Sequence, residues 1–86
     1  MGTWKYKLNI KQFINPSEPF EGVQKLLVKY LKRYKERFIE LEKKGKFSGD
    51  FDQIIFDLEG SNTVGEFDGA LSELYDYGDA NDIWLG

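Results

Sequence analysis

The chain contains no cysteine and no histidine among its 86 residues. Without cysteine there is no disulfide and no thiolate metal site, so the redox compartment is unconstrained and the cytoplasm is the predicted location. Without histidine the chain lacks the commonest general base and the commonest metal ligand. Its serines therefore have no imidazole to activate them, and no glycine-rich phosphate-binding loop is present. The composition argues against an enzyme, and we expect no catalytic residue and no cofactor.

Long apolar runs are also missing. No hydrophobic stretch approaches the ~18 residues that a membrane-spanning helix needs, so we expect no membrane partner. The composition is typical of a globular domain, with 41% hydrophobic, 16% aromatic and 31% charged residues. This length predicts a single globular domain over residues 1–86, and the aromatic side chains help so short a chain to build a core.

Positive charge is absent from the second half of the chain. All twelve Lys and Arg lie in residues 1–46, together with five Glu, whereas residues 47–86 hold ten Asp and Glu. The two halves therefore carry about +7 and −10, for a net charge of −3. An assignment of function has to explain this division.

The first half of the chain predicts a strand and a long helix. Residues 3–10 alternate apolar and polar side chains, as a half-buried strand does. A helix is predicted from Ser17, as its N-cap, to about Lys44, with Gly45 as a left-handed cap. Its apolar stripe has the 3–4 spacing of a helix face and consists of Phe20, Val23, Leu27, Tyr30, Leu31, Tyr34, Phe38 and Leu41.

The second half predicts two shorter helices and a final strand. Asp50 is placed to cap the first helix, within residues 48–60, and Thr63 to cap the second, within residues 63–78. The apolar residues of residues 48–60 share one face, from which Phe56 departs. The segment 82–86 reads as a short strand.

These elements predict an α+β domain with the order β-α-α-α-β. The two terminal strands have to pair with each other, because a lone strand leaves its N–H and C=O groups unsatisfied. We expect this sheet on a face of the long helix, with antiparallel strands. Gly65 and Gly69 lie inside the third helix, where glycine costs roughly 1 kcal/mol, and we expect them to allow close packing against a neighbour.

A group of cations lies opposite the apolar stripe of the long helix and consists of Lys25, Lys29, Lys32 and Arg33. Outward faces of helices are normally charged, which explains such a group without any function. However, like charges four residues apart destabilise a helix, and Lys25 with Lys29 and Lys29 with Arg33 are such pairs. This basic patch would allow nucleic-acid binding, although the negative net charge disfavours it.

The acidic second half has two interpretations besides metal binding. In the first, the shorter helices have acidic solvent-facing sides whose field partly balances the basic helix. In the second, residues 50–79 present an acidic helical face to the basic surface of a protein partner, in imitation of a nucleic-acid backbone. The residues that would form this surface are Asp52, Asp57, Glu59, Glu66, Asp68, Glu73 and Asp76.

A calcium site is the third interpretation of the acidic half. The segment DYGDAND offers oxygen ligands at Asp76, Asp79, Asn81 and Asp82, but it lacks the D-x-D-x-D-G pattern of a calcium-binding loop. A turn at the end of a helix explains Gly78 and Asn81 as well. We therefore expect no metal site.

Aromatic residues gather at the two ends of the chain. The first strand contains Trp4 and Tyr6, and Trp84 lies in the last strand between Ile83 and Leu85, which point the opposite way. One face of this sheet end is therefore apolar and exposed, and a two-stranded sheet has two open edges. Both features favour a binding surface, or a homodimer that shares a four-stranded sheet.

The ends also carry a resemblance. The opening WKYKL and the segment LYDYGDANDIW resemble small bacterial proteins that begin W-K-Y-K-L and end L-Y-D-x-(A/G)-D-x-x-x-(I/V)-W. The resemblance spans both ends, leaves out the long helix and implies no activity or site residue. We expect a bacterial or phage protein that acts as a non-enzymatic interaction or regulatory module, with nucleic-acid binding as the alternative.

Overall fold

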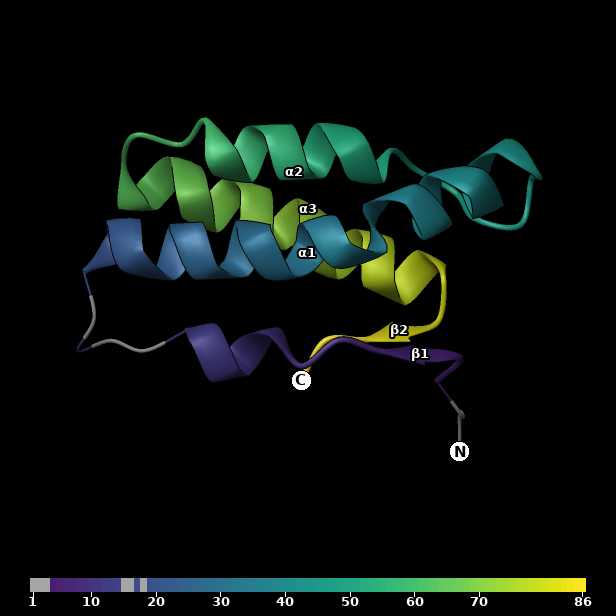
Figure 1. Cartoon of the computed structure of the whole chain (residues 1–86), viewed down its shortest axis with the longest axis horizontal. Helices are drawn as coiled ribbons and strands as arrows, with labels where there is room; N and C mark the ends of the chain where they lie inside the picture. Colours follow the sequence, from purple (N-terminus) through teal and green to yellow (C-terminus); the bar gives the residue numbers. More distant parts are fainter. Residues whose placement is uncertain (1–3, 15–16, 18) are drawn as a thin grey trace.

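The computed structural model describes residues 4–14, 17 and 19–86, so Thr3 and Glu18 of the predicted elements lie outside the described residues. The elements along the chain are β1 (Tyr6–Lys7), a 3₁₀ helix η1 (Ile10–Phe13), α1 (Phe20–Lys43), α2 (Phe51–Glu59), α3 (Val64–Ala80) and β2 (Ile83–Trp84). The three α-helices pack side by side, and the strands lie together along one side of them (Figure 1). The predicted single, mostly helical α+β domain is confirmed, with η1 as an unpredicted addition.

The two strands are parallel, with Tyr6 opposite Ile83 and Lys7 opposite Trp84, so the antiparallel prediction is wrong. The cause is visible in Figure 1. The chain reverses direction on entering α1, again on entering α2 and α3, and once more on entering β2. Three helices that run antiparallel to their neighbours therefore return the chain to the direction of β1.

The predicted helix ends are confirmed with two corrections, one of which is that α3 runs to Ala80, so that Gly78 lies inside it rather than in the turn at its end. Asp50 accepts a hydrogen bond from the Gln53 N–H at 3.1 Å at the start of α2, and Thr63 accepts one from the Glu66 N–H at 3.1 Å at the start of α3. Gly45 follows α1 with the predicted positive φ. The N-cap of α1 is Pro19 rather than Ser17, and its carbonyl accepts the N–H groups of residues 22 and 23.

The core lies where the apolar stripe of α1 meets α2, α3 and the strands. Phe38 is fully buried and sits at its centre, with its ring 5.0 Å from Phe51, 5.3 Å from Phe47 and 5.6 Å from Tyr6. Edge-on and tilted aromatic pairs of this kind each contribute about 0.5–1.5 kcal/mol beyond the area that they bury. The rings join α1 to α2, to the loop that follows α1 and to β1.

The glycines of α3 differ from the prediction. A Cβ on Gly69 would meet no atom within 4 Å, and Gly65 is exposed as well, so neither allows close packing. The close approach occurs at Gly78, where a Cβ would lie 2.8 Å from the Leu85 side chain and 3.0 Å from the carbonyl oxygen of Ile83. Gly78 therefore lets β2 pack directly against α3, whereas Gly69 leaves open space.

Candidate functional site

Side chains of α1 satisfy the backbone at both ends of α2. At its start, the Glu42 carboxylate accepts a hydrogen bond from the Phe51 N–H at 2.9 Å. At its end, the Gln24 amide donates to the carbonyl oxygens of Leu58, Glu59 and Ser61 at 2.6, 3.1 and 2.9 Å. A negative group at the start of a helix and donors at its end also suit the helix dipole. Backbone groups at both ends of α2 therefore have hydrogen-bond partners on α1.

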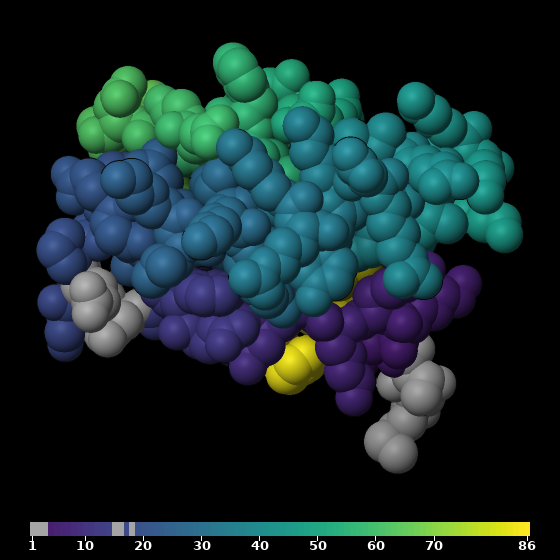
Figure 2. Space-filling view, viewed as in Figure 1, coloured from purple at the N-terminus to yellow at the C-terminus, as the bar shows by residue number. Residues whose placement is uncertain are grey.

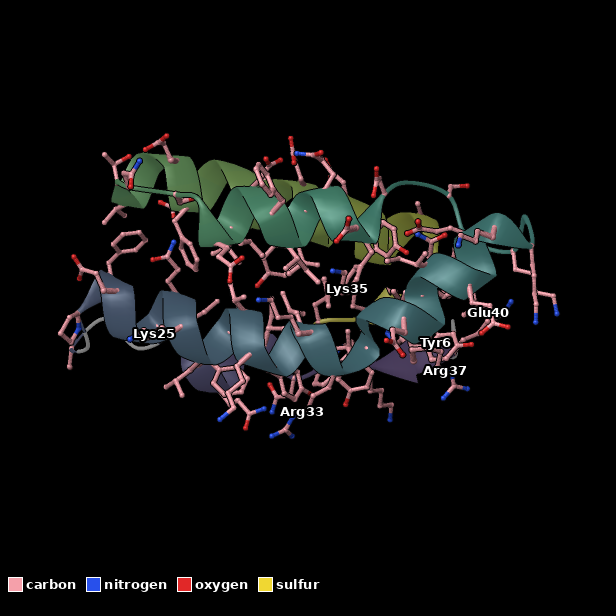
Figure 3. All side chains as sticks on the ribbon, turned by 45° about the horizontal axis from the view of Figure 1, so that its top comes forward. Tyr6, Lys25, Arg33, Lys35, Arg37 and Glu40 are labelled. Carbon is pink, nitrogen blue, oxygen red and sulfur yellow. The ribbon has the colours of Figure 1, made fainter. Side chains whose placement is uncertain are left out.

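Two ion pairs join the same flank of α2 to α1. The Lys32 ammonium lies 2.9 Å from the Glu59 carboxylate, and the Lys35 ammonium lies 2.9 Å from the Asp52 carboxylate. The hydrogen bond to Asp52 raises the pKa of Lys35 above its ordinary value. Figure 3 shows Lys35 pointing from α1 toward α2, whereas Arg33 points away from α2. Two of the predicted partner carboxylates and one of the predicted patch cations are thus used within the fold.

The other predicted carboxylates form no ion pair with any residue that the structure describes. Glu66 accepts hydrogen bonds from Asn62 and Thr63 at the start of α3, and Asp57 accepts one from the Gln53 amide. Asp68, Glu73 and Asp76 are exposed and have no hydrogen bond or ion pair with any residue that the structure describes. The predicted acidic surface therefore divides into a paired part facing α1 and an unpaired part on the far side.

Apart from Asp68, the unpaired part lines the seam between α2 and α3. Two hollows lie along this seam, with volumes of about 360 and 390 Å³, and Glu73 lines both of them. Phe56, 68% exposed, stands at the rim of the first hollow, and Gly69 and Ala70 line it beside Asp57. Asp76 lines the second. We call these two hollows and their rims the acidic seam; its lining residues come from 48–80, where the sequence contains no Lys or Arg.

The predicted basic patch gathers around an exposed leucine. Lys25, Lys29 and Arg33 are exposed and form no ion pair within the described part of the chain. Leu26, 56% exposed, lies among them, beside a hollow of about 660 Å³ that Lys25 and Lys29 also line. Figure 2 shows the broad face that α1 presents, with α2 above it. We call Lys25, Leu26, Lys29 and Arg33 the Leu26 surface.

The aromatic sheet end is present but small. Trp4 and Trp84 are both partly exposed and line a hollow of about 240 Å³ together with Tyr75. Each strand has only two residues, and the carbonyl of Ile83 faces Gly78 of α3. α3 therefore lies against β2, and a sheet shared between two copies would have little free backbone to use.

The segment considered for calcium contributes to the fold instead. The Asn81 side chain accepts a hydrogen bond from the Ser48 N–H at 2.7 Å and donates to the carbonyls of Ser48 and Tyr77, both at 2.8 Å. It thereby ties the loop before α2 to the end of α3. Among the described residues, no group of three or more Asp and Glu side chains is placed to hold a metal ion.

A second polar contact ties α1 to α3. The Tyr77 hydroxyl donates to Glu42 at 2.6 Å, and burial together with this bond raises the pKa of Tyr77 well above its ordinary value. Sequence reasoning missed the roles of Gln24 and Glu42, because their α2 and α3 partners lie far along the chain. Only Asn81 carried a signal, since Asn is common just after a helix.

No protein-family model, curated protein or solved structure that was compared matches this chain. The resemblance of its two ends to small bacterial proteins therefore stays a prediction. Within the part of the chain that the structure describes, no helix has both the length and the apolar character needed to cross a membrane.

Proposed function

We propose that this protein is a non-enzymatic interaction module whose acidic seam binds a basic segment of a protein partner. The observation that carries the proposal is the position of Glu73. Glu73 lines both hollows of the seam, and its carboxylate has no hydrogen bond or ion pair among the described residues. A carboxylate between two open hollows is placed to meet a ligand, whereas Asp52 and Glu59 are occupied by α1.

The chemistry of the seam suits lysine or arginine side chains. Such side chains combine an apolar stem with a charged head, so they can cover apolar surface and still reach a carboxylate. Phe56 and Ala70 supply the apolar contact in the first hollow, and Glu73 with Asp57 supplies the charge. A cation above the exposed ring of Phe56 also gains a cation–π interaction. The surplus negative charge would speed the encounter with a basic partner.

Nucleic-acid binding through the Leu26 surface is the alternative, and the three unpaired cations there support it. The two functions separate on a heparin or DNA column at low salt. Strong retention that salt abolishes would favour the alternative, because nucleic-acid binding releases counterions. We expect weak retention.

The proposal is tested by titrating the isotope-labelled protein with a lysine-rich peptide that carries a central leucine, and following backbone amide NMR signals. We expect the largest shifts around the acidic seam, in α2 and α3. Glu73→Lys should weaken binding about tenfold, which corresponds to about 1.4 kcal/mol.

The matched control is Asp68→Lys, because Asp68 lies on the same helix and is exposed but lines neither hollow. It should keep most of the affinity. An equal loss in both variants would show that only net charge matters, and shifts confined to α1 would place the peptide elsewhere; either result would refute the proposal.

A further inference from the structure

Two strongly exposed apolar side chains lie in surroundings of opposite charge. Phe56 is 68% exposed beside the carboxylates of the acidic seam, and Leu26 is 56% exposed among the cations of the Leu26 surface. Each of these side chains stands beside a hollow and among charged groups, so a surface of complementary shape and charge can cover it. Each surface therefore offers the charge that the other one lacks.

The shapes of the two surfaces also match. The acidic seam is open at Gly69, where a Cβ would meet no atom within 4 Å, so the hollow has room for an inserted aliphatic side chain. The hollow beside Leu26, at about 660 Å³, is floored by the buried Val28 and has room for an aromatic ring such as Phe56. Contact between the surfaces would cover both exposed side chains and bring Lys25 and Lys29 toward Glu73 and Asp57.

One copy cannot make this contact with itself. Helix α2 separates the two surfaces: Glu59, on its flank toward α1, lines the hollow beside Leu26, whereas Phe56 and Asp57 line the seam toward α3. The hydrogen bonds of Gln24 and Glu42 hold α2 against α1, which keeps the surfaces apart. The complementary surface has to come from a second molecule.

We propose that the basic segment bound by the acidic seam is the Leu26 surface of a second copy of this chain, so that copies associate head to tail. This inference rests on the proposed function of the seam. The contact joins two unlike faces, so each added copy brings a further seam and a further Leu26 surface, and the association continues into a chain or a ring of copies rather than stopping at a symmetric dimer. Because charge contributes to the contact, salt should weaken it.

Two variants that each disable one surface test the inference by analytical ultracentrifugation at low salt. Gly69→Leu fills the seam without a change in charge, and it replaces an exposed helical glycine with a better helix former, so the fold should not suffer. Leu26→Glu places a carboxylate at an exposed position among the cations. The matched control is Gly65→Leu, on the same helix but outside both hollows.

The wild-type protein should show a sedimentation coefficient that rises steadily with concentration, as should Gly65→Leu. Gly69→Leu alone and Leu26→Glu alone should both remain monomeric. An equal mixture of the two should form a dimer and stop there, because each partner then has one working surface. Association of the wild type should weaken at least about tenfold between low and high salt.

A wild type that stays monomeric from micromolar to near-millimolar concentration would overturn the inference, as would association that Gly69→Leu leaves unchanged. If the lysine-rich peptide still binds the seam of such a monomer, the proposed function stands and only the second copy is excluded; if it does not bind, both fail. A monomer that retains a DNA oligonucleotide, and loses it with Leu26→Glu, would assign the Leu26 surface to nucleic acid and also overturn the inference.

Discussion

The carboxylates on the two flanks of α2 differ in whether a cation lies beside them. On the flank toward α1, Asp52 and Glu59 meet lysines and the ends of the helix meet Gln24 and Glu42. On the flank toward α3, the carboxylates of the acidic seam meet no cation among the described residues. The separation of charge along the sequence therefore serves the fold on the first flank and leaves the second flank charged and open.

The contacts on the flank of α2 toward α1, which we call the inner flank, stabilise the folded state. The carboxylates on the flank toward α3, which we call the outer flank, destabilise it. Exposed ion pairs such as Lys32–Glu59 stabilise a protein by at most about 1 kcal/mol, whereas hydrogen bonds to half-buried backbone groups are costly to lose. Carboxylates that gather without cations repel one another and raise the free energy of the folded state. Substitutions on the inner flank should destabilise the protein, and neutralisation on the outer flank should not.

Among substitutions that distinguish the two flanks, Gln24→Ala should cause the largest loss of stability. Its amide donates to three carbonyl groups at the end of α2, and we expect its loss to lower the free energy of unfolding by about 1–3 kcal/mol. Chemical denaturation measures the change. Gln53→Ala is the control, because among the described residues the Gln53 amide bonds only to the half-buried Asp57 carboxylate, on the flank of α2 toward α3. A loss as large in the control would remove the distinction between the flanks.

The next effect is a loss of stability at high pH, caused by the buried hydroxyl of Tyr77. The pKa of Tyr77 is raised in the folded state, so folding favours the protonated hydroxyl. This stabilisation is fully present below about pH 10, where an unfolded tyrosine begins to ionise, and is lost as the pH rises further. The unfolding free energy of the wild type should therefore fall more steeply above about pH 10 than that of Tyr77→Phe. Tyr75→Phe is the control on the same helix, and equal slopes for all three proteins would contradict the assignment.

Substitutions of two lysines of α1 should change the stability by smaller amounts and in opposite directions. Lys32→Gln removes a partner of Glu59 and should cost at most about 1 kcal/mol. Lys29→Gln removes a cation that has like charges at Lys25 and Arg33, and it should stabilise the helix by about 0.3 kcal/mol. Thermal unfolding at low salt should show changes of opposite sign. If both variants gained stability or both lost it, the lysines that face solvent and those that face α2 would have the same electrostatic effect on the fold, which would contradict the distinction.

Sequence patterns predicted the parts of this fold that depend on neighbours within a few residues. The capping residues Asp50 and Thr63, the core stripe of α1 and the departure of Phe56 from the buried face all follow from local spacing. The direction of the strands did not follow, because it depends on how three helices pack against one another. The predicted strand over residues 3–10 is limited to Tyr6–Lys7, and the short helix η1 begins at Ile10, the last residue of the predicted alternation.

The candidate site was only half predictable for the same reason. Composition and spacing pointed to most of the carboxylates that line the seam, but they omitted Asp50, which lines its second hollow, and they could not tell which carboxylates α1 neutralises. That division arises because Lys32 and Lys35 project toward carboxylates of α2 that lie well beyond them in the sequence. Gly69 was noticed as anomalous, and its expected close packing was wrong, because the structure places it beside a hollow rather than beside a neighbour.

The salt dependence of thermal unfolding, measured at a protein concentration low enough to keep the chain monomeric, tests the central claim most directly. Between about 20 mM and about 500 mM NaCl the Debye length falls from about 20 Å to about 4 Å, which screens both the inner ion pairs and the repulsion in the acidic seam. If the seam carries surplus charge that the fold does not use, the melting temperature should rise with salt, and it should rise less in the Glu73→Gln, Asp76→Asn double variant. A clear fall in the wild-type melting temperature would show that the two halves of the chain neutralise each other within one molecule, and would contradict the account.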